Sequence, residues 1–593
     1  MPDPTSPAMR LAALRAELGR LGLDGMLVPR GDAFLGEYVP PSAERLAWLT
    51  GFTGSAGLAL VLPEQAFLFV DGRYTTQAER EADPTLWTLR HVTEQPPAEV
   101  LRTEAKGRRI GYDPWLHTEA ALAKLADAGA ALVPLDGNPI DAVWRDRPAP
   151  PEAPAVAHPL EFAGLDSAAK REEAAKALRD AGEDAAVLAD PHSVAWLLNM
   201  RGADLAYTPL ALAQALLRAD GTVTLFLDPA RADAALRAHL GNAVALRPPS
   251  ELGAALDGMA GRKLRLDPDV TPAWIARRLR AAGAEVVAGE DPCRLPRACK
   301  NAVEQDGARA AHRRDAVALA RFLAWFAGVP RDGLTEMRAA AHLLALRAGG
   351  ARFVAESFPA IAGAGEHGAI VHYRATEATD RPIRPDEVFL LDSGAQYRDG
   401  TTDVTRTLWT GPGAPPAELR ERYTRVLQGH LALAATRFPE GVAGPHLDAI
   451  ARRPLWEAGL DYDHGTGHGI GSFLSVHEGP AGISRAAKPV PLKPGMILSD
   501  EPGFYEPGAY GIRIENLLLV QRAASQPGQR KPFLAFEVLT LAPYERALIE
   551  GAMLTPAERA QVDAYHARVQ AEIGPLLDAP TRAWLDQACA PLR

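Results

Sequence analysis

Apolar residues recur at helical spacing near the start of the chain and form short strand-like runs after it. Leu11, Leu14, Leu18 and Leu21 are three or four positions apart, which predicts a helix over residues 9–22 with these side chains on one face. Another helix is expected to stop at Gly129. Between the two helices, apolar strands are predicted at residues 26–28, 58–62, 66–70 and 108–112. This alternation is typical of an α/β domain.

The pattern restarts after a segment rich in proline and alanine. Residues 148–159 fall within this segment and are predicted to be a linker, because so many prolines suit neither a helix nor a sheet interior. Beyond it, a helix, an apolar strand, a tryptophan-containing segment and a strand ending in Asp228 follow in the order of the first domain. We expect an internal duplication, although two domains of one class could share so loose a pattern by chance.

A long helix over residues 301–326 predicts the start of a third and larger domain. Short strands, glycine and proline turns and most of the informative histidines follow between residues 360 and 520. The last segment, residues 556–593, is expected to form one or two amphipathic helices. The predicted domains are therefore residues 1–147, 160–299 and 300–593.

Composition narrows the kind of protein. Of the 593 residues, 47% are apolar and 23% charged, which is an ordinary globular balance. The net charge of −10 and the lack of a long basic run argue against nucleic acid or an anionic membrane as the main partner. The first residues lack a signal-peptide core, and no apolar run is long enough to span a membrane. Three cysteines predict free thiols, and a cytoplasmic location is expected.

Residues 388–409 contain the first candidate metal ligands. An apolar run ends in Asp392, a turn-forming segment follows, and a second strand-like run contains Asp403, which predicts a hairpin. Two carboxylates on neighbouring strands repel each other and favour a divalent cation between them, although both could simply decorate a turn. A turn centred on residues 397–398 would oppose the two aspartates, whereas one centred on residues 399–400 would offset them.

Three further candidate ligands follow downstream. His468 lies in the glycine-rich HGTGHGIG, Glu501 at the end of an apolar strand, and Glu515 within a predicted strand. An acidic residue inside an apolar strand is costly unless it is paired or binds a metal. Four carboxylates and one imidazole suit Mn²⁺, Co²⁺ or Zn²⁺ in a two-metal centre better than a single structural zinc.

Several motifs of this region resemble the signature blocks of the Xaa-Pro aminopeptidases, which are metallopeptidases with the pita-bread fold. They are LLDSGAQYRDGTTDVTRT, IVHY, HGTGHGIG, VHEGP, DEPGFY and GIRIEN. The resemblance extends over the whole chain through GFTGSAG, DGRY, NPIDAVW and LLNMRG, and it is closest to the three-domain cytosolic form. It implies two similar creatinase-N-like α/β domains followed by a pita-bread catalytic domain.

The resemblance also implies the metal ligands. Asp392 would bind one metal, Asp403 and Glu515 would bridge or share both, and His468 and Glu501 would complete the coordination. The implied cofactors are two divalent ions, with Mn²⁺ preferred and Zn²⁺ or Co²⁺ as alternatives. The implied substrates are peptides with proline at the second position, and a homodimer is expected.

Further residues are candidates for the substrate site, and of these His372, His477 and Arg73 match family positions that contact substrate. His372 and His477 would donate hydrogen bonds to the developing oxyanion or the leaving group. His464, in a glycine-rich loop, would belong to the substrate pocket or play a structural part. Arg513 would orient Glu515 or another acidic group, and is otherwise an ordinary ion-pair residue. Arg73 would reach the peptide across a dimer interface, or is simply a residue of a surface turn.

The implied reaction is hydrolysis of the first peptide bond by a metal-activated hydroxide, with Glu501 moving a proton from that water to the leaving nitrogen. Two alternatives remain open at this point. A prolidase would cleave only Xaa-Pro dipeptides, and the motifs do not separate it from an aminopeptidase. A non-catalytic protein could use the same fold as a binding platform, but such proteins usually lack the metal ligands, and all five are present here.

Overall fold

The computed structural model describes residues 6–592, which form two compact units. One unit comprises the chain up to residue 160 together with residues 165–294, and the other comprises residues 161–164 and the chain from residue 295 onward. Within the described residues, no helix is both long and apolar enough to cross a membrane. In this part of the chain, no disulfide joins Cys293, Cys299 or Cys589. The predicted domain boundaries remain predictions.

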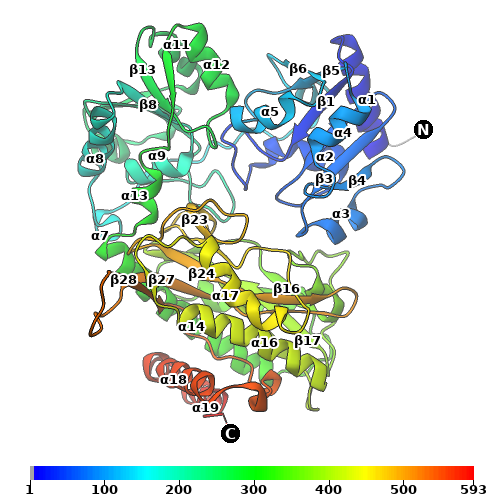
Figure 1. Cartoon of the computed structure of the whole chain (residues 1–593), viewed down its shortest axis with the longest axis vertical. Helices are drawn as coiled ribbons and strands as arrows, with labels where there is room; N and C mark the ends of the chain where they lie inside the picture. The colour runs from blue at the N-terminus through cyan, green and yellow to red at the C-terminus, as the bar shows by residue number, and fades with distance from the viewer. Residues whose placement is uncertain (1–5, 593) are drawn as a thin grey trace. The chain divides into compact units, whose positions relative to one another are not determined.

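The first unit contains two six-stranded sheets (Figure 1). In chain order, the strands of the first sheet are β1 (Gly25–Pro29), β2 (Leu58–Val61), β3 (Ala66–Val70), β4 (Thr88–His91), β5 (Arg109–Tyr112) and β6 (Ala131–Pro134). Those of the second sheet are β8 (Ala185–Leu188), β10 (Gln214–Arg218), β11 (Val223–Phe226), β12 (Val244–Arg247), β13 (Lys263–Leu266) and β14 (Glu285–Ala288).

The two sheets share one topology. Their strand orders are β4-β3-β2-β1-β5-β6 and β12-β11-β10-β8-β13-β14. In each sheet the two inner pairings made by the second strand are antiparallel, and the three remaining pairings are parallel. The same order with the same directions confirms that the chain contains two similar N-terminal α/β domains.

Helices accompany both sheets. They are α1 (Pro7–Arg20), α2 (Arg45–Thr50), α3 (Thr75–Glu81), α4 (Pro97–Glu104), α5 (Glu119–Ala126), α6 (Pro139–Val143), α8 (Ser167–Asp180), α9 (Pro191–Leu197), α10 (Ala234–Leu240), α11 (Leu252–Asp257) and α12 (Ala273–Ala281). In α1, Leu11, Leu14 and Leu18 are buried as predicted, but Leu21 is 39% exposed because the helix ends before it.

The predicted linker is partly ordered into a sheet. Strand β7 (Val156–Ala157) pairs antiparallel with β9 (Met200–Arg201), so backbone hydrogen bonds hold it within the first unit. The proline-rich residues before β7 have no regular secondary structure, as a chain short of backbone donors requires.

The second unit is built from two main sheets. The smaller has the order β16 (Ile361–Ala364), β17 (Val388–Ser393), β20 (Val404–Trp409). The larger has the order β21 (Phe438–Pro439), β28 (Phe533–Val538), β27 (Asn516–Arg522), β24 (Ile497–Asp500), β22 (Gly467–Gly469), β23 (Glu478–Ile483). Two small sheets complete the unit: β15 (Phe353–Glu356) with β18 (Ala395–Tyr397) and β19 (Gly400–Thr401), and β25 (Gly503–Glu506) with β26 (Tyr510–Arg513).

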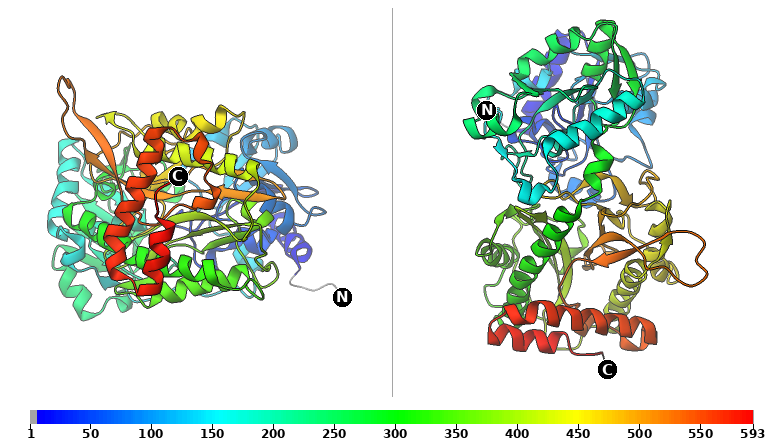
Figure 2. Two further views of the ribbon diagram at one scale, coloured as in Figure 1. Left: turned by 90° about the horizontal axis from the view of Figure 1, so that it is seen from below. Right: turned by 90° about the vertical axis from the view of Figure 1, so that its left-hand side faces the viewer.

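Long helices pack against these sheets. They are α14 (Ala302–Gly328), α15 (Glu336–Ala348), α16 (Ala417–Ala434), α17 (Pro445–Trp456), α18 (Pro556–Ile573) and α19 (Ala579–Ala588), after the short helices α7 (Leu160–Ala163) and α13 (Arg294–Ala298). The capping box formed by Asn301 and Glu304 starts α14, and that formed by Thr555 and Glu558 starts α18. The predicted C-terminal helices are α18 and α19, which run side by side (Figure 2, red).

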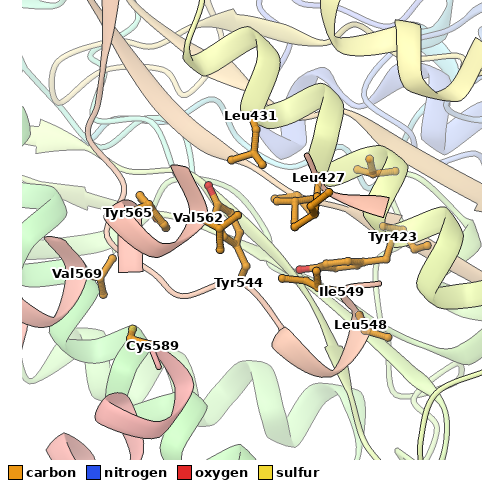
Figure 3. Close-up of a cluster of buried hydrophobic side chains, with 14 of the residues drawn as sticks. Tyr423, Leu427, Leu431, Tyr544, Leu548, Ile549, Val562, Tyr565, Val569 and Cys589 are labelled. Atoms are coloured by element: carbon orange, nitrogen blue, oxygen red, sulfur yellow. The ribbon is translucent and has the colours of Figure 1, made fainter. Parts of the chain in front are cut away.

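An apolar core joins α18 and α19 to α16. Leu427 and Leu431 of α16 pack with Val562 and Val569 of α18, and Tyr544 lies among them (Figure 3). All five side chains are almost fully buried. Burial of large apolar side chains is the main favourable term in folding, so the C-terminal helices are an integral part of this unit.

Candidate metal centre

The register of two neighbouring strands places Glu501 and Glu515 opposite each other. Strands β24 and β27 are antiparallel, and Asp500 pairs with Asn516 at their ends. Glu501 directly follows β24, and Glu515 directly precedes β27. Glu515 therefore lies at the break between β26 and β27, and the prediction that it sits within a strand is wrong, because the chain passes there from the small sheet of β25 and β26 to the larger sheet.

The second pair of carboxylates comes from the predicted hairpin. In the pairing of β17 with β20, Asp392 lies opposite Thr405, and Asp403 directly precedes β20. Tyr397 pairs with Gly400, so the turn is centred on residues 398–399, midway between the two centres considered above. This register offsets the two aspartates by two positions, and because side chains alternate along a strand, a two-residue offset leaves both on one face.

A backbone contact brings the two pairs together. The N–H of Glu515 donates to the carbonyl of Thr405 across 3.2 Å, and the hydroxyl of Thr405 donates to Oε2 of Glu515 across 2.7 Å. The smaller sheet is thereby joined to the larger one beside the carboxylates. Nε2 of His468 lies 3.3 Å from Oε1 of Glu501 and 3.6 Å from Oδ2 of Asp403.

The site has the geometry of a metal centre. One possible ligand atom from each of Asp403, His468 and Glu515 lies within 4.8 Å of the other two. Each of these atoms carries a lone pair, and a cation between them would neutralise charges that otherwise repel.

Mutual repulsion changes how the carboxylates titrate. Burial, followed by the charges of Asp392 and Glu501, raises the pKa of Asp403 well above its usual value. Burial and the charge of Asp403 do the same to the pKa of Glu515. Burial also raises the pKa of Glu501 to about 7, although the positive charge of Arg513 opposes the shift. The carboxylates of Asp403, Glu501 and Glu515 therefore lie close together in a buried site, where little solvent screens their repulsion.

Two carboxylate oxygens lack a partner that a metal would supply. Oδ1 of Asp392 and Oδ1 of Asp403 are buried, and neither accepts a hydrogen bond from any residue in 6–592. Buried polar atoms are rarely left unpaired, because an unmet acceptor costs about 1–3 kcal/mol. Carboxylate oxygens together with one imidazole nitrogen are donors that suit a divalent cation. The residues of the site therefore fit the predicted metal ions.

Arg513 connects this cluster rather than acting on Glu515 directly. Its Nη2 donates to Oδ2 of Asp392 across 2.7 Å, and its Nη1 donates to the hydroxyl of Tyr505 across 2.7 Å. Its Nε lies 3.3 Å from the hydroxyl of Thr405, which in turn holds Glu515. The predicted role with an acidic group fits this contact with Asp392, while Glu515 is reached through Thr405.

His464 takes part in the same network. Its Nε2 lies 2.8 Å from the hydroxyl of Tyr505, and its Nδ1 lies 2.8 Å from the carbonyl of Gly465. The segment has no helical structure, as its glycines indicated. Burial raises the pKa of Tyr505 to about 12, so the phenol is a neutral link between His464 and Arg513.

The two other histidines come from different segments near the predicted ligands. The ring of His477 packs edge-on against the ring of His468, with 4.2 Å between centroids. His372 follows Val371, whose carbonyl lies 3.4 Å from Nη1 of Arg513. The catalytic roles of His372 and His477 remain predictions.

Arg73 belongs to the other compact unit. It follows β3 and binds Asp71 through two hydrogen bonds, of 3.0 and 2.8 Å, while its guanidinium lies over the ring of Tyr74. Both side chains of the ion pair are about 30% exposed. Its contact with a peptide across a dimer interface remains a prediction.

Several functional residues were not singled out from the sequence. Thr405 and Tyr505 connect the ligands as described above, and the hydroxyl of Ser499 donates to Oε1 of Glu501 across 2.9 Å. Each lies within two to four residues of a predicted ligand, so proximity to the motifs was an available signal. Which hydroxyl points into the site depends on strand register, and the sequence left that register open.

Comparison with known protein families agrees with this architecture. Residues 10–143 and 146–304 each match the creatinase/prolidase N-terminal domain. Residues 306–522 match metallopeptidase family M24, and residues 532–592 match the C-terminal region of that peptidase family.

Individual relatives match the whole chain. A probable Xaa-Pro aminopeptidase P of Coccidioides posadasii is 38% identical over 99% of this chain and 100% of its own length. The chain belongs to the Xaa-Pro aminopeptidase family. Aminopeptidase P2 of Arabidopsis thaliana is 38% identical over 96% of this chain and 86% of its own length.

A solved family structure has the same fold. The X-prolyl aminopeptidase of Caenorhabditis elegans, described as a cytosolic enzyme with a di-nuclear active site, superposes with a TM-score of 0.93. It is 35% identical and covers 99% of this chain and 100% of its own. Family membership and this match confirm the predicted fold class, with two creatinase-type domains before a pita-bread domain, and the predicted class of hydrolase.

Proposed function

We propose that this protein is a metal-dependent aminopeptidase that removes the first residue from peptides with proline in second position. The observation that carries the proposal is the convergence of four carboxylates and His468 from five separate segments, with Oδ1 of Asp392 and Oδ1 of Asp403 buried and unpaired. Membership of the Xaa-Pro aminopeptidase family supplies the substrate class.

Two divalent ions are the proposed cofactors, and Mn²⁺ is the preferred candidate over Zn²⁺ and Co²⁺. The di-nuclear site described for the Caenorhabditis elegans relative supports the number. Asp392, Asp403, His468, Glu501 and Glu515 would hold them, with Asp403 and Glu515 shared by both. When bound, the ions supply positive charge that activates water as a nucleophile and polarises the scissile carbonyl.

Three side chains are proposed to act on the reacting atoms. The carboxyl of Glu501, which lies 3.3 Å from Nε2 of His468 and accepts a hydrogen bond from Ser499, would take a proton from water and give it to the leaving nitrogen. His372 and His477 would donate hydrogen bonds to the oxyanion that develops on the carbonyl. The remaining residues proposed to contribute to substrate binding are His464, Arg513 and Arg73.

The proposed substrate explains why such a site is needed. The bond before proline is a tertiary amide without an N–H, so a protease cannot align it through that donor. A site that grips the free α-amino group and accommodates the pyrrolidine ring does not need the donor.

The experiment that tests the proposal compares two substrates with and without metal. After chelation, the protein should be inactive, and added Mn²⁺ should restore release of arginine from Arg-Pro-Pro peptides. Faster cleavage of the dipeptide Arg-Pro would instead favour a prolidase. Failure to cleave either substrate, with no divalent ion bound on metal analysis, would favour a non-catalytic binding protein.

A homodimer and a cytoplasmic location are also proposed. The relative from Caenorhabditis elegans is described as cytosolic, and that description supports the location. Sedimentation of the metal-loaded protein would measure the oligomeric state directly.

A further inference from the structure

The buried carboxylate of Glu336 lies outside the metal cluster and binds several groups of the loop that contains His372. Oε1 of Glu336 accepts from the N–H of Ala364 across 2.7 Å, and Oε2 accepts from the hydroxyl of Tyr373 across 2.9 Å. Nδ1 of His367 lies 3.0 and 3.1 Å from the two oxygens, and the N–H of Arg381 lies 3.4 Å from Oε2. The groups around this one carboxylate thus span residues 364–381.

Glu336 is itself held rigidly. It is the first residue of α15, which Thr335 caps by accepting from the N–H of Arg338. The side chain of Glu336 is fully buried, and Ala339 and Leu343 on the same helix belong to an apolar core shared with α14. A carboxylate on a packed helix is a fixed anchor, whereas the segment it binds is largely irregular.

The loop is also seated closely on its other side. A Cβ added to Gly511 of β26 would lie 1.8 Å from the carbonyl oxygen of Gly368, and one added to Gly363 would lie 2.7 Å from the N atom of Gly368. Only glycine permits so close an approach of backbones. Nη1 of Arg513 lies 3.4 Å from the carbonyl oxygen of Val371.

His372 therefore lies between two fixed neighbours. Val371, before it, faces Arg513 and hence Asp392, and Tyr373, after it, is bound to Glu336. The ring of Tyr373 also packs in an apolar cluster with Ile361 and with Leu390, two residues before Asp392 on β17.

We propose that Glu336 is a positioning residue for the peptidase reaction: by binding Ala364 and Tyr373, it holds the loop so that His372 meets the substrate carbonyl. The inference rests on the proposed function, because it needs His372 to act on substrate. Glu336 touches neither the substrate nor the reacting atoms. A small displacement of a catalytic group is costly, since an error of about 1 Å can slow a reaction about 100-fold.

Glu336→Gln is the most direct test, because the amide keeps the volume of the carboxyl but replaces one acceptor oxygen with a donor. In the metal-loaded full-length protein, we expect kcat/KM for an Arg-Pro-Pro peptide to fall about 10- to 100-fold. Tyr373→Phe removes one hydroxyl only and should lower kcat/KM about threefold to tenfold. If the Glu336→Gln variant does not fold, Tyr373→Phe takes its place in every comparison.

A double-mutant cycle with His372→Ala separates positioning from general stability. If Glu336 acts through His372, then Glu336→Gln should lower kcat/KM less than about twofold further when His372 is already absent. Equal losses in both backgrounds would overturn the proposal, as would unchanged kcat/KM in both Glu336→Gln and Tyr373→Phe.

Hydrogen–deuterium exchange supplies a readout that does not depend on activity. Glu336→Gln should speed exchange at residues 364–373 and leave α14 and β27 unchanged; protection equal to wild type at residues 364–373 would refute the anchor. If the wild-type holoenzyme cleaves no peptide, the proposed function fails, and the exchange experiment still tests the anchor by itself. If the wild type is active and His372→Ala keeps full activity, the proposed function stands, and the role of Glu336 in positioning His372 is overturned.

Glu304 provides a matched control. It is also a buried carboxylate in the first turn of a packed helix of the second unit, but its Oε2 accepts from the N–H of Asn301 across 3.0 Å and not from the loop. Glu304→Gln should lower the melting temperature while keeping kcat/KM within about twofold and exchange at residues 364–373 unchanged. A loss of kcat/KM equal to that of Glu336→Gln would show that general destabilisation explains both, which would overturn the proposal.

Discussion

Nη2 of Arg513 donates a 2.7 Å hydrogen bond to Oδ2 of Asp392, and both side chains are buried. The same guanidinium binds the hydroxyl of Tyr505 and lies beside the hydroxyl of Thr405. A fixed cation next to a metal ligand offsets part of the negative charge of the cluster and sets which oxygen of Asp392 faces the site. The free oxygen is Oδ1, which accepts no hydrogen bond from the described residues.

Replacing Arg513 with lysine should weaken this arrangement without removing the charge. Lysine lacks the planar fork that binds Asp392 and Tyr505 together, so Asp392 loses its fixed orientation. We expect metal affinity or kcat to fall about 10- to 100-fold, as measured by metal titration and peptide cleavage. Arg309→Lys, at an ion pair with Glu537, should leave both unchanged. Equal metal affinity and kcat in Arg513→Lys and wild type would contradict the assigned role.

Glu501→Gln should abolish turnover while the fold is kept. The amide cannot take a proton from water, so kcat should fall at least about 100-fold even when metal is supplied in excess. Metal analysis of the variant distinguishes a lost proton transfer from a lost ligand. The exposed Glu506, five residues further on, provides the control, and Glu506→Gln should keep full kcat. Near-normal kcat in metal-replete Glu501→Gln would contradict the role of Glu501 in proton transfer.

Metal binding should stabilise the protein more at high pH than at low pH. The folded-state pKa of Glu501 is raised from 4.5 to about 7, and those of Asp403 and Glu515 are raised as well. For an acid with a raised pKa, folding is favoured at low pH, where the group is protonated, and loses stability as pH rises through the folded value. The metal-free protein should therefore weaken between about pH 5 and pH 8.

Added Mn²⁺ cancels that loss, because it compensates the ionised carboxylates. The rise in melting temperature on adding Mn²⁺ should be larger by several degrees at about pH 8 than at about pH 5. Thermal unfolding followed at both pH values, with and without chelator, measures the difference. An equal rise at both values would contradict the coupling between metal and these carboxylates.

His566 should make the protein sensitive to acid at a place apart from the metal ligands. Its ring is fully buried, and Nε2 accepts from the N–H of Tyr544 across 3.1 Å. Burial, with the charges of Arg406 and Arg546, lowers its pKa to about 4, although Asp563 opposes the shift. The stability that comes with a neutral ring is present above 6.5, the usual value, and is lost as pH falls toward about 4, to the extent of about 3 kcal/mol.

His566→Gln keeps an acceptor but cannot charge. Its free energy of unfolding should fall less than that of wild type between about pH 7 and pH 4, by up to about 3 kcal/mol, in urea titrations at each pH. His446 is an exposed histidine whose Nδ1 likewise accepts a backbone N–H, from Ala443, across 3.1 Å. His446→Gln should follow wild type, and a His566→Gln curve parallel to wild type would disprove the prediction.

The main features of this protein could be predicted from its sequence alone. Helical spacing of leucines placed α1, and two rounds of the same strand pattern predicted the two similar sheets. The acidic residues at strand ends, together with His468, identified the ligand candidates, because carboxylates next to buried strands are too costly without a partner. The resemblance of the motifs predicted the family. These inferences succeed because they depend on local periodicity and on residue type.

Only the tertiary structure decided how those residues meet. The turn of the hairpin is centred between the two expected positions, and Glu515 lies at a break between strands, because register depends on pairing across the whole sheet. Arg513 reaches Asp392, a residue 121 positions away, and Glu336 reaches a loop about 30 to 45 positions away. Periodicity along the chain carries no information about such contacts. They arise when separate strands and helices pack, because packing brings a buried charge next to the hydrogen-bond and ion-pair partners that compensate the cost of its burial.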